Sequence, residues 1–159
     1  RVIVTSQEAD LTMNAITDLP PHEVWNYLND PSHRIKWETS QGIQDSDGRP
    51  SIGRQSLCVE GNKTFTEILL DWKPFDYYSV ARVLPFGNKK GAGIQALTTF
   101  KLNPTTSGGT NLQIYCKVRS TLPHWAVRFI ARSILRYMKI EPAYINLSNL
   151  LTGAGEKNH

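Results

Sequence analysis

The pattern of apolar and polar positions is most regular between Leu122 and Leu151, where it predicts a long helix. Its basic side chains share one sector of a helical wheel, which holds Arg128, Arg132, Arg136 and Lys139, with Asn146 beside them. The opposite sector is mostly apolar, with the i, i+4, i+7 spacing typical of a buried stripe. That stripe contains Ala126, Ile130, Ile134, Tyr137, Glu141, Tyr144 and Ile145.

Two residues interrupt this helical pattern. Glu141 falls inside the apolar stripe, and Pro142 follows it. Because proline has no N–H, the carbonyl of Met138 would lose its helical partner, and we expect a kink there. A carboxylate on a buried face is costly unless it is paired or used. Glu141 therefore either tilts to the rim and stays solvated, or faces the interior as a functional residue.

The chain before this helix reads mainly as short strands. Alternating segments predict strands over residues 11–16, 55–60, 64–72, 77–84, 94–102 and 111–119. Turns rich in Gly, Pro, Asn and Asp separate the later ones. In the last strand, Leu112, Ile114, Cys116 and Val118 share one face, and polar residues occupy the other. One apolar and one polar face is typical of an antiparallel sheet that is covered on one side.

Two short helices are predicted between the first and second of these strands. Pro21 and Glu23 suit a first helical turn, and Asp30 followed by Pro31 suits the cap and start of a second helix. The second helix should end near Trp37 and bury Ile35 or Trp37. One strand, two helices, a run of strands and a final helix together predict an α+β fold with the sheet wrapped over the helix.

This order resembles the helix-grip fold of the Bet v 1/START superfamily, in particular its bacterial polyketide-cyclase-like (SRPBCC) members. The residues that carry the resemblance are 15–17 leading into 21–31, then Trp37, Gly53, residues 67–75 and the terminal helix. It implies a curved antiparallel sheet wrapped around a long C-terminal helix, with a cavity between them. We expect a single domain over residues 1–159, with flexible ends at 1–9 and 153–159.

The residues that would line this cavity follow from strand alternation and from the helical stripe. We expect ligand-binding side chains at Trp25, Trp37, Cys58, Tyr78, Phe100, Ile114, Cys116, Ile130, Ile134, Tyr137, Met138 and Glu141. Leu102 and Tyr144 belong to the same surfaces. A mostly apolar pocket with a few polar groups suits a small hydrophobic ligand. The alternative is that these side chains simply fill the core.

Candidate catalytic residues are Glu141, Arg82 and Tyr137. Glu141 could act as a base with a raised pKa or accept a hydrogen bond from a ligand. If Tyr78, Val80 and Arg82 face inward, the guanidinium could pair with Glu141 or with an anionic ligand. A register shift of one residue would instead place Arg82 on the solvated face. Glu60 and Glu67 likewise could face either the interior or the solvated side of the sheet.

Composition and charge narrow the classes of function. The chain is 40% hydrophobic and 20% charged, with no apolar run long enough to span a membrane. A net charge of +4 is too small to indicate nucleic-acid binding, and we interpret the basic row of the last helix as a solvated face rather than a nucleic-acid or membrane contact. Gly87–Gly93 opens a predicted strand, not a helix, so we interpret it as a strand connection rather than a phosphate-binding loop.

Cysteine and histidine usage gives no sign of a metal or a cofactor. Cys58 and Cys116 lack metal or redox spacing, which predicts buried free thiols in a reducing, cytoplasmic compartment. The sequence has no H-E-x-x-H motif, and no histidine is visibly paired with a nucleophile. The chain begins with Arg1, so we also expect that it is processed or belongs to a longer polypeptide, another domain of which is a possible partner.

Three functions remain open at this point. The first, which we favour, is binding of a lipid, isoprenoid or aromatic metabolite without catalysis. The second is an enzyme similar to polyketide cyclases, in which Glu141, Arg82 and Tyr137 position a poly-β-ketone for ring closure and dehydration. The third is a ligand-sensing accessory domain of a larger signalling protein. We expect no nucleic-acid partner and no stable insertion into a membrane.

Overall fold

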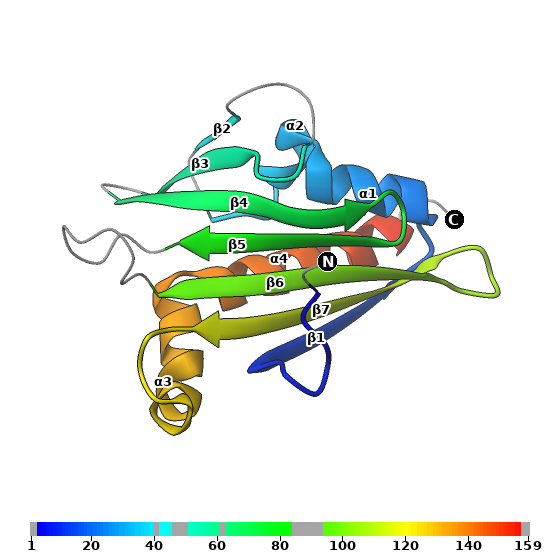
Figure 1. The fold of residues 1–159 in the computed structure, drawn as a ribbon. Helices are drawn as coiled ribbons and strands as arrows, with labels where there is room; N and C mark the ends of the chain where they lie inside the picture. The colour runs from blue at the N-terminus through cyan, green and yellow to red at the C-terminus, as the bar shows by residue number, and fades with distance from the viewer. Residues whose placement is uncertain (1–2, 40–41, 46–50, 61–62, 84–93, 157–159) are drawn as a thin grey trace.

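The strands form one curved antiparallel sheet. A computed structural model describes residues 3–39, 42–45, 51–60, 63–83 and 94–156. Within them, seven strands are hydrogen-bonded in the order β1-β7-β6-β5-β4-β3-β2 (Figure 1). The strands are β1 (Leu11–Thr17), β2 (Gly42–Asp45), β3 (Gln55–Glu60), β4 (Lys63–Lys73), β5 (Tyr77–Val83), β6 (Gln95–Pro104) and β7 (Thr110–Arg119). All the expected strands are present, and β2 is an addition that the sequence pattern did not predict.

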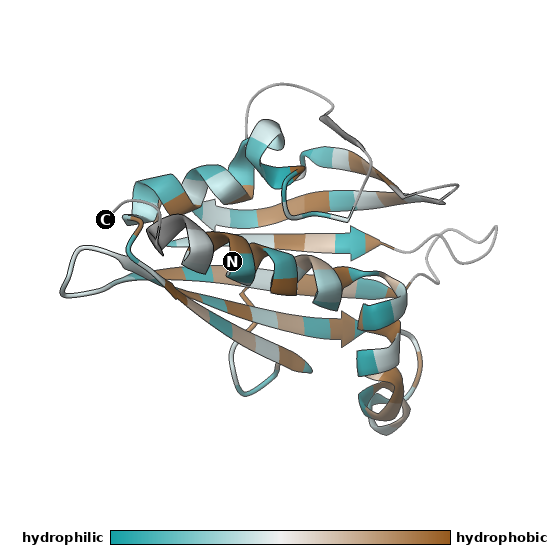
Figure 2. Cartoon of the chain, turned by 180° about the vertical axis from the view of Figure 1, so that it is seen from behind, coloured by the Kyte–Doolittle hydropathy of each residue, from teal (hydrophilic) through white to brown (hydrophobic). Residues whose placement is uncertain are grey.

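Helices cover one face of this sheet. They are α1 (Pro21–Asn29), α2 (Pro31–Arg34), α3 (His124–Tyr137) and α4 (Ile140–Glu156). Seen from behind, α4 lies across the sheet, and apolar positions recur along the strands beneath it (Figure 2). The face toward α4 carries Leu112, Ile114, Cys116 and Val118 of β7, each no more than 4% exposed. The α+β helix-grip arrangement expected from the sequence is confirmed.

Local chemistry explains where the first two helices begin. Pro21 opens α1, and Glu23 adds a carboxylate to its first turn. Asp30 caps α2 by accepting from the backbone N–H of Ser32 at 2.9 Å. The chain then turns so that Trp37 is 2% exposed, whereas Ile35 is 48% exposed. Of the two residues expected to compete for burial, Trp37 is therefore the buried one.

The long C-terminal helix is in fact two helices. The break falls where the carbonyl of Met138 was expected to lose its helical partner: α3 ends at Tyr137, and Lys139 has a left-handed φ of 53° before α4 begins at Ile140. Pro142 then lies in the first turn of α4, where a missing N–H has no cost. The physical reason still involves Pro142, because a continuous helix would require its N–H to reach the carbonyl of Met138.

The break changes which side chains are buried. The expected stripe is wrong at Ile130, Tyr137 and Ile145, which are 39%, 53% and 44% exposed. The buried face of α3 instead consists of Val127, Ala131 and Leu135. A single continuous wheel cannot describe both helices, because the left-handed residue between them changes the rotational phase. Arg128, Arg132, Arg136 and Lys139 are exposed, as expected.

Both ends of the chain contain ordered residues. Val4 is 5% exposed, and its N–H donates to Oγ1 of Thr99 at 2.8 Å, so residues 3–9 are not simply a flexible end. At the other terminus, α4 continues to Glu156, and residues 157–159 lie outside the described part of the chain. In the described residues, no helix has both the length and the apolar character needed to cross a membrane.

Candidate functional site

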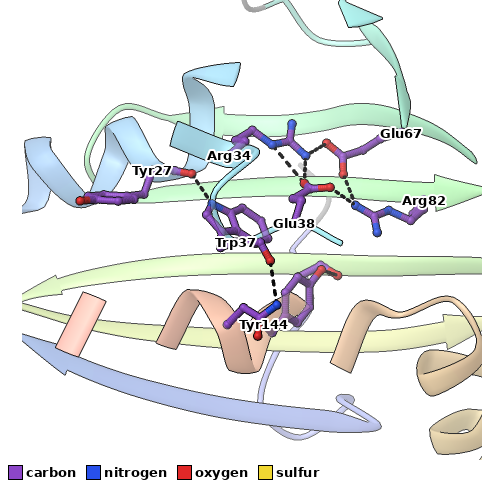
Figure 3. A network of polar contacts seen from close by, with 9 residues as sticks. Tyr27, Arg34, Trp37, Glu38, Glu67, Arg82 and Tyr144 are labelled. Carbon is purple, nitrogen blue, oxygen red and sulfur yellow. Dashed lines mark hydrogen bonds and ion pairs between the residues drawn. The ribbon is translucent and has the colours of Figure 1, made fainter. Parts of the chain in front are cut away.

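Two arginines and two glutamates form a buried cluster between the sheet and the segment that follows α2. Glu67 of β4 and Arg82 of β5 are direct cross-strand partners. Arg34 ends α2, and Glu38 follows it at i+4, close enough for the two side chains to pair. Figure 3 shows the four side chains pointing toward one another across the gap between β4, β5 and α2. We call Arg34, Glu38, Glu67 and Arg82 the ion cluster.

Each arginine in the ion cluster contacts both carboxylates. Arg34 binds Oε1 of Glu38 and lies 2.8 Å from Oε1 of Glu67. Nη2 of Arg82 lies 3.0 Å from Oε2 of Glu38 and 3.3 Å from Oε2 of Glu67. Every oxygen of the two carboxylates therefore faces a guanidinium, and the positive and negative charges balance.

The ion cluster is almost fully removed from solvent. The side chains of Arg34, Glu38, Glu67 and Arg82 are between 1% and 7% exposed. Burial alone would lower the pKa values of Arg34 and Arg82, but Glu38 and Glu67 outweigh it and raise both above the ordinary arginine value. Both guanidinium groups therefore stay charged. Desolvating such charges is expensive, and replacing them with apolar side chains often increases stability.

Aromatic rings form the wall beside the ion cluster. Phe100 is the centre of this group: its ring centroid lies 6.4 Å from Trp37, 6.3 Å from Tyr78 and 5.3 Å from Tyr144. Trp37 is fixed at both ends of the residue, because Nε1 donates to the carbonyl of Tyr27 at 2.7 Å and its own carbonyl accepts from Nδ2 of Asn146 at 3.4 Å. The rings come from β5, β6, α4 and the turn after α2.

A small cavity lies between these rings and the ion cluster. Its walls are Leu28, Arg34, Trp37, Glu38, Glu67, Tyr78, Val80, Arg82, Phe100 and Tyr144. The space open to the centre of a water molecule is about 10 Å³. That is room for about one water molecule. The walls are apolar on one side and fully charged on the other.

Comparisons with solved structures identify this architecture. A Mesorhizobium loti protein, MLL2253, superimposes with a TM-score of 0.65 at 18% identity, covering 89% of this chain and 95% of that one. Ara h 8.0201, a Bet v 1 homologue, gives 0.58 at 12% identity, with 89% and 95% covered. The chain has the Bet v 1-like helix-grip fold.

A third similar structure is matched over less than half of its own length. DynU16, a protein in the dynemicin biosynthetic locus, gives a TM-score of 0.61 at 15% identity, and the match covers 89% of this chain and 46% of DynU16. No protein-family model matches the sequence. A search of curated proteins found no match either.

Several residues expected to line a helix-grip cavity do so here. Trp37, Tyr78 and Phe100 line it, together with Arg82. Arg82 faces inward with Tyr78 and Val80, so of the two registers left open by the sequence the inward one is present. Five other expected residues are buried in the core without lining this cavity, namely Trp25, Cys58, Ile114, Cys116 and Met138. Trp25 packs instead on Trp72, with ring centroids 6.1 Å apart.

The expected pairing of Glu141 with Arg82 is wrong. Glu141 accepts from Nε of Arg136 at 2.8 Å and from Nη2 of Arg132 at 3.2 Å. Partial burial raises the pKa of Glu141, but the hydrogen bonds from Arg136 and Arg132 outweigh it and hold the pKa below its ordinary value. This is the opposite of the raised pKa expected for a base. The break before α4 turns Glu141 toward the α3 arginines rather than toward the cavity.

The helix residues expected around Glu141 are also absent from the cavity wall. Tyr137 and Ile130 are exposed, and Ile134 is half-buried against the core. The three candidate catalytic residues, Glu141, Arg82 and Tyr137, are therefore not assembled at the cavity. Among the described side chains of α4, only Tyr144 reaches it. Burial raises the pKa of the Tyr144 hydroxyl well above its ordinary value, and the hydroxyl donates to Oγ1 of Thr98 at 2.7 Å.

Sequence reasoning missed Arg34, Glu38 and Leu28 as cavity residues. The spacing of Arg34 and Glu38 at i and i+4 with opposite charges was an available signal for a pair. Nothing in the spacing showed that the pair is buried, because α2 has only 4 residues and no periodic face. Glu67, which we considered a weaker candidate, is a member of the ion cluster.

Both cysteines are free and buried, as expected. Burial raises the pKa of each thiol to about 12, and for Cys58 the negative charge of Glu67 adds to the effect. Neither is placed to act as a nucleophile at neutral pH. Among the described residues, no three His, Cys, Asp or Glu side chains are grouped so that they could hold a metal ion. The side chain of Glu60 and residues 87–93 lie outside the described part.

Proposed function

We propose that this protein binds a small, mostly apolar molecule between the sheet and α4, and that an uncharged oxygen group of the ligand contacts the ion cluster. One observation carries the proposal: four buried charges form one wall of an aromatic-lined cavity. A purely structural core would not need them, because apolar side chains of similar volume would fill the same space at lower cost.

The aromatic wall supports an apolar, flat ligand body. Trp37, Phe100 and Tyr144 present ring faces and edges from three different elements around one space. Rings held in this way bind another ring or a conjugated chain through stacking and edge contacts. An aromatic metabolite fits this wall best, and isoprenoids and lipids are the other members of the apolar class.

Charge balance in the ion cluster determines which polar group of a ligand is preferred. A carboxylate placed beside Arg34 and Arg82 would compete with Glu38 and Glu67 and leave an uncompensated negative charge in a buried site. A phenol or ketone oxygen adds no charge and can still form a hydrogen bond with a guanidinium or a carboxylate. We therefore infer a preference for neutral phenols and ketones over the corresponding acids.

Ligand entry requires the cavity to enlarge. Space for about one water molecule cannot hold a ring system. Residues 35–39 carry both Trp37 and Glu38 and contain no regular helix or strand, so outward movement of this segment would open the cavity from the side of α2. The contacts that must then break are the hydrogen bonds of Trp37 with Tyr27 and Asn146 and the ion pair of Glu38 with Arg82.

A cyclase-type enzyme is the alternative that we rank second. Such chemistry requires an acid and a base beside the substrate. The carboxylates nearest the cavity, Glu38 and Glu67, are each held between two arginines. Both oxygens of each carboxylate therefore already face an arginine rather than a substrate, so binding is the function that we favour.

The test compares two ligands that share one ring system and differ in their polar group. Native mass spectrometry and thermal shift would be measured with 2-naphthol and 2-naphthoate, after examining freshly purified protein for a copurified adduct. We expect 2-naphthol to bind about tenfold more tightly than 2-naphthoate. In Glu38→Gln, which leaves an excess positive charge, the preference should reverse.

A matched variant separates this effect from a general change in charge. Glu8→Gln makes the same chemical change at a half-exposed glutamate paired with Lys117, and it should leave the preference unaltered. Absence of any adduct or thermal shift in both the unmodified protein and Glu38→Gln would refute ligand binding. Equal binding of phenol and acid by the unmodified protein would refute the proposed role of the ion cluster.

A further inference from the structure

Large hydrophobic side chains project into solvent from α3. Phe129 is 84% exposed, Trp125 70%, Tyr137 53% and Ile130 39%, and Leu122 just before the helix is 47% exposed. Scattered exposed apolar residues are ordinary, but several large ones on a single helix mark a contact surface. The buried face of α3 already packs through Val127, Ala131 and Leu135, so these side chains are not needed to hold the helix in place.

Basic side chains lie along one edge of the same surface. At about 100° per residue, Trp125 and Phe129 lie in the middle of the exposed sector, with Arg128 and Arg132 on one side and Tyr137 and Ile130 on the other. Arg136 falls between Trp125 and Phe129. Residues 122–140 contain no aspartate or glutamate, so no acidic side chain of the helix interrupts this surface. We call Leu122, Trp125, Arg128, Phe129, Ile130, Arg132, Arg136 and Tyr137 the α3 surface.

The carboxylate of Glu141 orders part of the basic edge. It holds Arg132 and Arg136, whose side chains remain 65% exposed. Arg128, Arg132, Arg136 and Lys139 carry four positive charges, and the carboxylate of Glu141 supplies one negative charge. Most of the positive charge of this segment therefore stays uncompensated. The α3 helix also lies at one end of the molecule, away from α1 and α2 (Figure 1). A flat partner can therefore approach it without meeting those two helices.

We propose that the α3 surface docks the protein on an anionic phospholipid bilayer, with Trp125 and Phe129 entering the interfacial region. Tryptophan and tyrosine favour the boundary between headgroups and acyl chains, and neighbouring arginines gain energy from anionic headgroups. An amphipathic helix that carries aromatic and basic side chains together on its exposed surface lies in the membrane plane rather than across it. The α3 helix is 14 residues long and lies parallel to a docked surface in this arrangement.

A protein partner is the competing occupant, since aromatic residues and arginine are also enriched in protein interfaces. The observations favour the bilayer because the exposed side chains radiate from a convex helix over about half its circumference. A fluid lipid surface adapts to such a shape, whereas a protein would need a matching groove. The row of arginines without an acidic counterpart in the helix adds charge complementarity to anionic lipid in particular.

Vesicle binding tests the proposal. The full chain would be mixed with phosphatidylcholine vesicles and with vesicles in which a third of the lipid is phosphatidylglycerol, then sedimented. We expect binding to the anionic vesicles, weakened by salt because the attraction is screened. The emission of Trp125 should shift to shorter wavelength. Trp25 and Trp37 are already buried and Trp72 packs on Trp25, so these three should change little.

Two variants and their matched controls decide which side chains are responsible for vesicle binding. Trp125→Ala/Phe129→Ala should lower the partition coefficient about a hundredfold, whereas Ile52→Ala, at a residue 67% exposed elsewhere, should not change it. Arg128→Glu should lower it about tenfold, and Lys101→Glu, on β6, should have a much smaller effect. Circular dichroism checks that each variant is folded.

The outcomes that would overturn the proposal are equally definite. No binding to either vesicle, or equal binding to neutral and anionic vesicles, would exclude an anionic bilayer as the occupant. A dimer in analytical ultracentrifugation that Trp125→Ala/Phe129→Ala dissociates would show that a second copy covers the α3 surface. A protein ligand that protects Trp125 without any lipid binding would identify a protein partner instead.

Discussion

Glu67 and Arg82 lie directly opposite each other on β4 and β5, with Oε2 of Glu67 3.3 Å from Nη2 of Arg82. Both side chains are less than a tenth exposed, and both also contact a residue from the α2 segment. The pair therefore connects the sheet to the segment that carries Trp37 and Glu38. This geometry makes the ion cluster a unit whose members cannot be removed independently.

Arg82→Leu should destabilise the protein by about 3–5 kcal/mol, because it leaves Glu38 and Glu67 buried with only Arg34 between them. Adding Glu67→Leu should recover part of this loss, since Arg34 and Glu38 then form a balanced pair. Urea unfolding of the two single variants and the double variant measures the coupling. Lys73→Ala, which removes an exposed pair with Asp76, should cost less than about 1 kcal/mol. Simple additivity of the Glu67 and Arg82 changes would contradict the prediction.

Stability should fall in acid partly through Glu141. Its pKa in the folded protein lies below the ordinary value of 4.5. The ion pairs with Arg132 and Arg136 therefore contribute stability above pH 4.5, and this contribution disappears as the pH falls through the lower folded pKa. Glu141→Gln should be less stable at neutral pH and lose less stability on acidification. Thermal unfolding between pH 7 and pH 3 checks this, and parallel curves for the two proteins would contradict it.

The thiols of Cys58 and Cys116 should be protected in the folded protein. Burial raises the pKa of each from 9.0 to about 12, so the folded protein retains both thiol protons where the unfolded chain loses them. Their contribution to stability is therefore complete below pH 9 and is lost as the pH rises toward 12. Pulsed alkylation at pH 8 in increasing urea should label both cysteines along the global unfolding curve. Labelling of either thiol without urea would contradict the burial.

Two glycines should respond to alanine in opposite directions. A Cβ at Gly109 would lie 2.3 Å from the carbonyl oxygen of Thr17, so Gly109→Ala should cost about 1–3 kcal/mol. A Cβ at Gly153, inside α4, meets no atom within 4 Å, and Gly153→Ala should stabilise the helix by about 0.5–1 kcal/mol. Urea unfolding of both variants tests the packing of β7 against the end of β1.

Strand alternation predicted most of the sheet and a useful part of the site. It buried Ile114 and Cys116 on β7, because period-two patterns survive wherever one face is covered, but it left open whether Arg82 faces inward from β5. It could not place Arg34 and Glu38. Their element is too short for periodicity, and their burial depends on Glu67 and Arg82, which are far away in the sequence.

In the C-terminal helices the periodic pattern was clear, but it was interpreted with the wrong helix boundaries. A wheel drawn over residues 122–151 assumed one continuous helix, which the left-handed conformation of Lys139 interrupts. The expected stripe fails at Ile130 and Tyr137 before the break and at Ile145 after it. Pro142 signalled the interruption correctly, but its effect appears earlier in the chain than the proline itself. Glu141 was therefore assigned to the cavity, although it lies where α3 meets α4 and binds Arg132 and Arg136.

Lys139 also divides the C-terminal segment into two separately hydrogen-bonded helices. In a continuous helix, a displacement of Trp125 would be coupled through the helical backbone to Tyr144 at the cavity. With a left-handed residue between them, the two helices are connected through side chains, because Glu141 of α4 binds Arg132 and Arg136 of α3. A disturbance at the α3 surface therefore reaches α4 through two ion pairs rather than along a continuous helical backbone.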